Sequence, residues 1–238
     1  MPQHLPPRFG PKPPLTPDRL QGPPIRLVIF DCDGVLVDSE GLSNRIVAQE
    51  ITKLGWPMTE AESTELFVGH RLSDIPAVIE AKLGQAVPNG WVEMLRARLI
   101  AAFDIVPTIP GAHAALQAVI ALGLPFRVAS NSSHEEMDAK FHHTGLAALV
   151  QRRQHSARDV LHGKPAPDVF LHAAQAEGIP PSDCVVIEDS LPGIAAARAA
   201  GMRVIGLETH GNANILRNAG AYPIATLGNL PALLRVLA

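Results

Sequence analysis

One stretch decides the fold of this 238-residue chain: Ile25-Arg26-Leu27-Val28-Ile29-Phe30-Asp31-Cys32-Asp33-Gly34. Its first six residues are apolar except for Arg26 and rich in β-branched side chains, which predicts a buried strand of a parallel sheet. Polar residues follow at once, so Asp31 is expected at the carboxyl end of that strand. Ligands of open α/β sheets bind beyond this end of the strands, and the segment is therefore a candidate site.

The chain beyond the first strand divides into a helical part and an alternating part. Residues 39–108 show only helical periodicity, which predicts an α-helical domain inserted after the first strand. Residues 109–238 alternate between helix and strand, which predicts, together with residues 25–38, an α/β core with a Rossmann-like parallel sheet. Further strands are predicted at 126–129, 184–187 and 203–205, and helices at 112–122, 168–177 and 194–200. A capping box of Ser133 and Glu136 predicts the start of another helix.

Composition excludes several classes of protein. Lys and Arg total 20 against 23 Asp and Glu, and a net charge of −3 gives no broad field for attracting nucleic acid or an anionic membrane. No apolar run reaches the roughly 18 residues of a membrane span. The two cysteines are too few for a disulfide framework and fit a reducing cytoplasm. Nothing indicates an obligate protein partner, and a monomer is the default expectation.

Residues 1–24 contain nine of the 22 prolines. A segment so rich in Pro, Gly and polar residues buries too little apolar surface to offset its chain entropy. We therefore expect a disordered Pro-rich tail.

Four polar segments are expected to meet at one edge of the sheet, because each follows a strand or lies between two of them. They are Asp31-Cys32-Asp33-Gly34, Ser130-Asn131-Ser132, Lys164-Pro165-Ala166-Pro167-Asp168 and Glu188-Asp189-Ser190. Their carboxylates would crowd together, and each close pair repels by roughly 4 kcal/mol at about 4 Å and an effective dielectric near 20. A bound cation relieves this repulsion, and oxygen ligands shared with a phosphate favour Mg²⁺ over Zn²⁺. The candidate metal ligands are Asp31, Asp33, Glu188 and Asp189.

Each polar residue type fits one step of phosphoryl transfer. The Asp31 carboxylate can attack phosphorus and form an aspartyl phosphate. Asp33 can protonate the departing alkoxide and then take a proton from the attacking water. Lys164 can neutralise charge on the transferred group, and Ser130 and Asn131, or backbone N–H groups beside them, can bind phosphate oxygens.

The four segments resemble the motifs of the haloacid dehalogenase superfamily, and from about Ile25 onward the chain is similar to its β-phosphoglucomutase-like branch. This resemblance implies that Asp31 is the nucleophile and Asp33 the acid/base. It implies that Mg²⁺ is held by Asp31, the backbone carbonyl of Asp33 and Asp189, with Glu188 adjoining. It also implies that the helical insertion is a mobile cap whose closure excludes water.

Within the superfamily, the residues at a few positions favour a phosphatase over a dehalogenase or a mutase. Dehalogenases of the superfamily are expected to lack the second aspartate, so Asp33 favours phosphoryl transfer. Mutases of the branch use a histidine after the first motif and an arginine in the cap loop. At the corresponding positions this chain has Ser43 instead of the histidine and the stretch 68–72 as the cap loop, which favours hydrolysis over a mutase reaction. In that stretch, His70 and Arg71 are expected to contact substrate.

The predicted protein is a Mg²⁺-dependent phosphoric monoester hydrolase acting on a sugar, polyol or sugar-acid phosphate. A sugar phosphomutase remains the main alternative. A phosphorylation switch of the receiver type and an inactive metabolite-binding protein are further alternatives. The order and completeness of the four motifs disfavour both.

Overall fold

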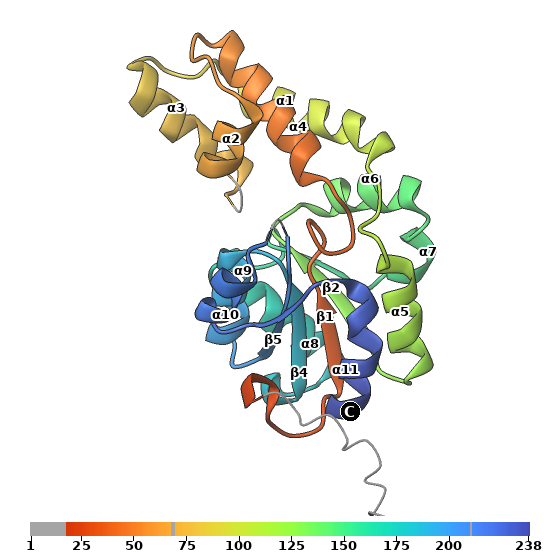
Figure 1. Cartoon of the computed structure of the whole chain (residues 1–238). Helices are drawn as coiled ribbons and strands as arrows, with labels where there is room; N and C mark the ends of the chain where they lie inside the picture. The colour runs from red at the N-terminus through yellow and green to blue at the C-terminus, as the bar shows by residue number, and fades with distance from the viewer. Residues whose placement is uncertain (1–17, 68–69, 210) are drawn as a thin grey trace, which may run out of the picture.

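The computed structural model describes residues 18–67, 70–209 and 211–238, and at its centre lies a parallel sheet of six strands (Figure 1). In spatial order the strands are β3 (Gln154–Ser156), β2 (Phe126–Ser130), β1 (Leu27–Phe30), β4 (Cys184–Glu188), β5 (Arg203–Leu207) and β6 (Tyr222–Ile224). The sheet confirms the predicted α/β class with a Rossmann-like core. The strand order reverses at β1, which has β2 on one side and β4 on the other.

Both faces of the sheet are buried, which explains why β1 reads as a continuous apolar run. Leu27 and Ile29 pack into one hydrophobic cluster, whereas Val28 and Phe30 pack into the other, as the two-residue period of a strand requires. All four side chains are fully buried. Helices cover each face: α8 (Asp168–Glu177), α9 (Leu191–Ala199) and α10 (Ala213–Ala219) lie on one, and α5 (Ala112–Ala121) and α11 (Leu230–Leu237) on the other (Figure 1).

The helices of the core begin and end close to where the sequence placed them. α8 has the predicted bounds, and α5 ends one residue earlier than predicted. The predicted capping box opens α6 (His134–Thr144): the Ser133 side chain accepts from the Glu136 backbone, and the Glu136 side chain accepts from the Ser133 backbone. A short helix α7 (Ala147–Val150) follows.

The helical insertion lies between β1 and β2 in sequence and beyond the carboxyl ends of the strands in space (Figure 1). It contains α1 (Glu40–Lys53), α2 (Glu60–Phe67), α3 (Ile75–Leu83) and α4 (Trp91–Ala102), with the 3₁₀ turns η2 (Leu72–Asp74) and η3 (Phe103–Ile105). Its two connections to the core are joined, because Val37 pairs antiparallel with Thr108 and the Asp38 amide donates to the Pro107 carbonyl. The two strands of chain that enter and leave the insertion therefore run side by side.

The folded region begins earlier than predicted. Residues 1–17 of the predicted tail lie outside the described residues, but residues 18–24 do not. A 3₁₀ turn, η1 (Asp18–Leu20), places Leu20 in the main hydrophobic cluster, where it is fully buried. Within the segment predicted as a tail, residues 18–20 therefore form a short turn whose Leu20 side chain packs on the core.

Among the described residues, none of the helices has both the length and the apolar character needed to cross a membrane.

Candidate active site

The candidate site lies at the carboxyl ends of β1 and β4, the neighbouring strands where the strand order reverses. Asp31 directly follows β1, and Glu188 and Asp189 end and follow β4. The Asp31 amide donates to the Ile187 carbonyl at 2.9 Å, which continues the pairing of the two strands up to the site. Crevices at such reversal points are the usual ligand sites of open α/β sheets. Two of the four predicted segments thus lie side by side at this edge of the sheet.

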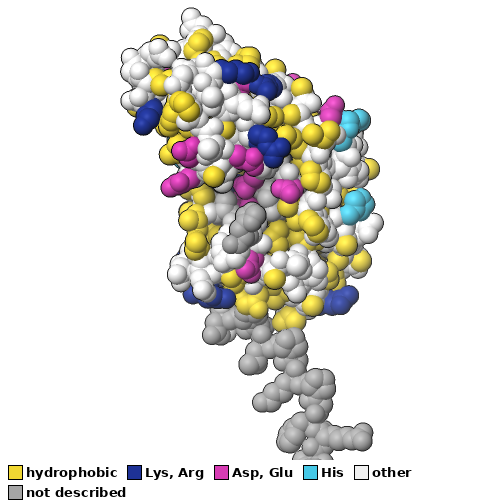
Figure 2. All heavy atoms as spheres, turned by 45° about the horizontal axis from the view of Figure 1, so that its top comes forward, with side chains coloured by type: hydrophobic (Ala, Val, Ile, Leu, Met, Phe, Trp, Pro, Cys, Tyr) yellow, Lys and Arg dark blue, Asp and Glu magenta, His cyan; other side chains and the backbone are white. Residues whose placement is uncertain are grey.

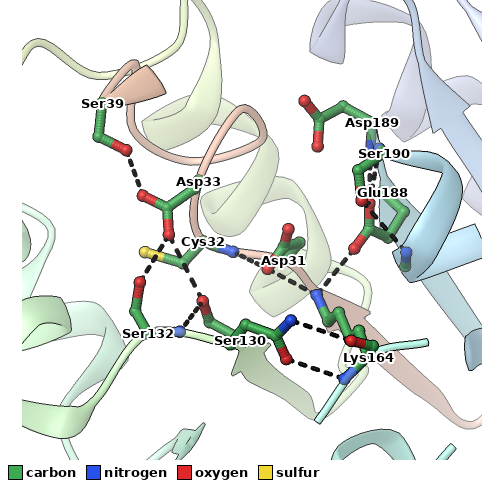
Figure 3. A network of polar contacts seen from close by, with 12 residues as sticks. Asp31, Cys32, Asp33, Ser39, Ser130, Ser132, Lys164, Glu188, Asp189 and Ser190 are labelled. Carbon is green, nitrogen blue, oxygen red and sulfur yellow. Dashed lines mark hydrogen bonds and ion pairs between the residues drawn. The ribbon is translucent and has the colours of Figure 1, made fainter. Parts of the chain in front are cut away.

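Lys164 joins the two acidic segments. Its Nζ lies 2.8 Å from Asp31 Oδ1 and 2.7 Å from Glu188 Oε1, and its side chain is only 4% exposed (Figure 3). Burial alone would lower the pKa of Lys164, but the charges of Asp31 and Glu188 raise it above its ordinary value. Lys164 is therefore firmly protonated and neutralises part of the buried negative charge.

Asp189 carries a buried carboxylate oxygen that no described protein group satisfies. Its Oδ1 has no hydrogen-bond partner among the described residues, although buried polar atoms are nearly always paired. One oxygen each of Asp31, Glu188 and Asp189 lies within 4.8 Å of the other two. Burial, followed by the charge of Glu188, raises the pKa of Asp189. Three converging carboxylates with one unpaired oxygen fit a hard divalent cation such as Mg²⁺.

A glycine makes room for the Asp189 carboxylate. A Cβ atom on Gly34 would lie 2.0 Å from Asp189 Oδ2, and Gly34 has a φ of 73°. Both the space and the backbone conformation thus require glycine, because a left-handed φ disfavours other residues. The chain turns after Asp33 so that the backbone itself approaches the acidic cluster.

Both carboxylate oxygens of Glu188 accept hydrogen bonds from protein groups. Its Oε2 accepts from the backbone amides of Asp189 and Ser190, each at 2.8 Å, and from the Ser190 hydroxyl at 2.9 Å. Its Oε1 accepts from Lys164. A Cβ on Gly193 would lie 1.6 Å from Oε1, so this glycine also leaves space for a carboxylate. Glu188 therefore orients Lys164 and the start of α9 beside the cluster.

The Asp33 side chain lies apart from this cluster and points toward α6 and the start of α1 (Figure 3). Its Oδ1 accepts from Ser39 and, at 2.6 Å, from Lys140 Nζ, while its Oδ2 accepts from Ser132 at 2.9 Å. Burial alone would raise the pKa of Asp33, but the Lys140 charge and these hydroxyl groups lower it. Asp33 is thus ionised in this arrangement, and an acid role requires its surroundings to change when substrate binds.

The second predicted motif supports the loops around the site. Asn131 clamps the backbone of Lys164: its Oδ1 accepts from the Lys164 amide at 2.9 Å and its Nδ2 donates to the Lys164 carbonyl at 3.2 Å. The buried Ser130 hydroxyl accepts from the Ser132 amide at 3.0 Å. Both residues line the cavity described below, and in this structure their side chains bind neighbouring loops.

A cavity of about 230 Å³ opens above the carboxylates between core and insertion. Acidic and basic side chains gather on the face where these two parts meet (Figure 2). The core supplies Asp31, Asp33, Asp189 and Lys164, and the insertion supplies His70 and Arg71, which sequence reasoning assigned to substrate contact. Val68 and Gly69, which precede them in the predicted cap loop, lie outside the described residues.

Arg71 of the insertion lies close to the core. Its Nη2 would lie 3.1 Å from a Cβ on Gly163, the residue before Lys164. A glycine at this position therefore lets the insertion approach the lysine loop.

Lys140, which is as deeply buried as Lys164 and binds Asp33, was not predicted from the sequence. Nor was the contact between α6 and the insertion, in which Arg96 of α4 donates to Glu136 at 3.0 Å. The available signal was the helical spacing of α6: Lys140 is four residues after Glu136 and lies between the buried apolar residues Met137 and Phe141. A charged residue on the buried face of a helix indicates a buried partner.

Comparison with known proteins identifies the family. Residues 25–201 match the haloacid dehalogenase-like hydrolase family. The 6-phosphogluconate phosphatase of Escherichia coli is 30% identical over 182 residues, which cover 76% of this chain and 81% of that protein. The chain belongs to the haloacid dehalogenase-like hydrolases, as its motifs predict.

Two further proteins are similar to this chain. A haloacid dehalogenase family hydrolase from Deinococcus radiodurans, solved with bound phosphate and sodium, has 34% identity and a TM-score of 0.73, covering 90% of this chain and 96% of that one. The protein SUPPRESSOR OF QUENCHING 1 of Arabidopsis thaliana is 34% identical over 87% of this chain, but the chain spans only 20% of that protein's length. The word phosphatase in the name of the bacterial relative agrees with the predicted phosphoric monoester hydrolase.

Proposed function

We propose that the protein is a Mg²⁺-dependent phosphatase that hydrolyses a small phosphorylated metabolite, a sugar, polyol or sugar-acid phosphate, through an aspartyl phosphate on Asp31. The observation that carries the proposal is the unpaired buried Oδ1 of Asp189 beside Asp31 and the Lys164 ammonium. Carboxylates that need a cation, next to a lysine that can hold a phosphate, suit phosphoryl transfer better than any other chemistry of the family.

In the first step, the Asp31 carboxylate attacks phosphorus, and the bond between phosphorus and the ester oxygen breaks. Asp31 is suited to this because Oδ1 is held by the Cys32 amide at 2.7 Å and by Lys164 at 2.8 Å, which fixes the carboxylate in place. The leaving alkoxide takes a proton from Asp33, and Lys164 offsets negative charge on the transferred group.

In the second step, a water molecule attacks the aspartyl phosphate and gives a proton to the Asp33 carboxylate. The phosphorus–oxygen bond to Asp31 breaks, which releases inorganic phosphate and restores the carboxylate. Asp31, Asp189 and the Asp33 carbonyl are the groups that would hold Mg²⁺. When bound, the cation supplies a counter-charge that lets the phosphate approach the acidic site.

The test is release of inorganic phosphate from a panel of phosphorylated sugars, polyols and sugar acids by purified, metal-stripped protein. Activity should be absent with chelator and return with Mg²⁺. Rapid acid quenching after mixing with ³²P-labelled substrate should trap label on the wild-type protein and not on Asp31→Asn. Phosphate release without trapped label would contradict the aspartyl intermediate.

The same panel separates hydrolysis from mutase activity. Conversion of a hexose 1-phosphate to its isomer without phosphate release would overturn the phosphatase proposal in favour of a mutase. Turnover that is unchanged in chelator would contradict the metal requirement, because the acidic cluster would then function without a cation.

A further inference from the structure

Two buried lysines bind different carboxylates of the site. Lys164 pairs with Asp31 and Glu188, whereas Lys140 pairs with Asp33. The three carboxylates whose oxygens converge are Asp31, Glu188 and Asp189, and the Asp33 side chain is not among them. Yet Asp33 is only two residues from Asp31, close enough in the chain for its side chain to turn toward a cation.

Lys140 is held in place by several contacts. Its side chain is 4% exposed, and Nζ lies 2.6 Å from Asp33 Oδ1 and 3.0 Å from Ser132 Oγ. Its Nζ also lies 4.5 Å from the centre of the Phe103 ring in η3. Packing and hydrogen bonds thus fix the ammonium, and an ammonium fixed in this way fixes its carboxylate partner.

The other partners of Asp33 restrain it less. Ser39 and Ser132 offer hydroxyl donors that carry no charge. Ser130 Oγ lies 3.5 Å from Asp33 Oδ2, at the outer limit of a hydrogen bond. Among the described residues, Lys140 is the only cation within salt-bridge distance of Asp33.

We propose that Lys140 is a positioning residue: it holds the Asp33 carboxyl group out of the cation-binding cluster and so reserves Asp33 for proton transfer. The inference deepens the proposed function and rests on it for the role of Asp33. Without Lys140, the Asp33 carboxylate would be drawn to the cation as an additional ligand. The site would then bind metal more tightly and transfer protons less well.

The first measurement compares two phosphate esters with wild-type protein, Lys140→Met and Lys140→Arg. An alkyl phosphate needs a proton on its leaving group, whereas p-nitrophenyl phosphate hardly does. For Lys140→Met we expect kcat on the alkyl ester to fall about 30-fold, within the range of general acid catalysis, with KM changed less than about 3-fold. On p-nitrophenyl phosphate kcat should change less than about 3-fold, and Lys140→Arg should recover most of the alkyl activity.

Two further variants sharpen this measurement. In an Asp33→Asn background, Lys140→Met should cause no additional loss, because the two side chains act as one unit. Lys53→Met is a control for loss of a lysine from an ion pair: Lys53 is exposed, pairs with Glu50 within α1 and does not line the cavity, so both esters should be hydrolysed at wild-type rates.

The second measurement is Mg²⁺ binding by calorimetry without substrate. Lys140→Met should bind Mg²⁺ at least about 3-fold more tightly than wild type, and adding Asp33→Asn should abolish the gain. If Lys140→Met does not fold, Lys140→Gln, which keeps a donor without the charge, should give the same changes in the same directions.

Equal losses on both esters, an unchanged or faster alkyl turnover, or an unchanged Mg²⁺ affinity would each overturn the proposal. These outcomes are distinct from failure of the proposed function. If wild-type protein hydrolyses neither ester in the presence of Mg²⁺, the phosphatase proposal fails, while the Mg²⁺ affinities still decide whether Lys140 restrains Asp33.

Discussion

Replacing Asp189 with asparagine should stabilise the metal-free protein while removing its response to Mg²⁺. The Asp189 oxygen lies within 4.8 Å of those of Asp31 and Glu188, and each such pair repels by about 3.5 kcal/mol at an effective dielectric near 20. Lys164 contacts the other two carboxylates but makes no salt bridge to Asp189 among the described residues. Allowing for relaxation and for the hydrogen bonds of the new amide, we expect a gain of about 2 kcal/mol, or roughly 4–8 °C in Tm for a domain of this size.

Thermal unfolding in chelator and then in excess Mg²⁺ measures both effects. Wild-type Tm should rise with Mg²⁺ because the cation binds only the folded state, whereas Asp189→Asn should rise little or not at all. Asp138→Asn is the matched control, since Asp138 is exposed and its acceptor bond from Gln154 survives in an asparagine. A variant that is less stable than wild type in chelator, or that gains as much from Mg²⁺, would refute the reasoning.

Three other changes test the site and the core. Asp31→Asn should abolish turnover while leaving the Tm in chelator equal or higher, and activity above about 1% of wild type would contradict the nucleophile assignment. Gly34→Ala should cost more stability than Gly84→Ala and lose the Mg²⁺ response; both have positive φ, but only at Gly34 does the new methyl group meet Asp189. Burial and a neighbouring histidine lower the pKa of His155 to about 4, so stability should be lost as pH falls from about 6.5 toward 4, by at most about 3 kcal/mol. Urea unfolding at both pH values should show a smaller loss in His155→Asn.

The parts of the fold that depend on local patterns were predictable. The buried strand at β1, the bounds of α8 and the capping box at Ser133 each follow from a few adjacent residues. The edge strands β3 and β6 were not predicted, because each has only three residues, too few to display a period. Their pairing is decided by neighbouring strands rather than by their own sequence.

The residues of the site likewise fall into those that local sequence patterns predict and those that they do not. Three of the four motifs were visible because polar residues stand directly after apolar runs, and the lysine motif because two prolines follow Lys164 closely. Lys140 was not, because it contacts a residue 107 positions away and lies within a helix of ordinary composition. Leu20 was missed for a related reason: a Pro-rich context dominated its segment, while the pocket that receives Leu20 is built from distant elements.

In the proposed mechanism Asp31 must be ionised and Asp33 must carry a proton, and the surroundings of each side chain shift its pKa in the opposite direction. Burial raises the pKa of Asp31, which must be ionised to attack, and Lys140 helps to lower the pKa of Asp33, which must carry a proton to the leaving group. A cation beside Asp31 favours its ionised form, and a phosphate dianion arriving near Asp33 favours its protonated form. The cation therefore lowers the pKa of Asp31 and the substrate raises the pKa of Asp33, as the proposed reaction requires. On this reasoning the two aspartates reach the protonation states of the proposed reaction only when both the cation and the substrate are bound.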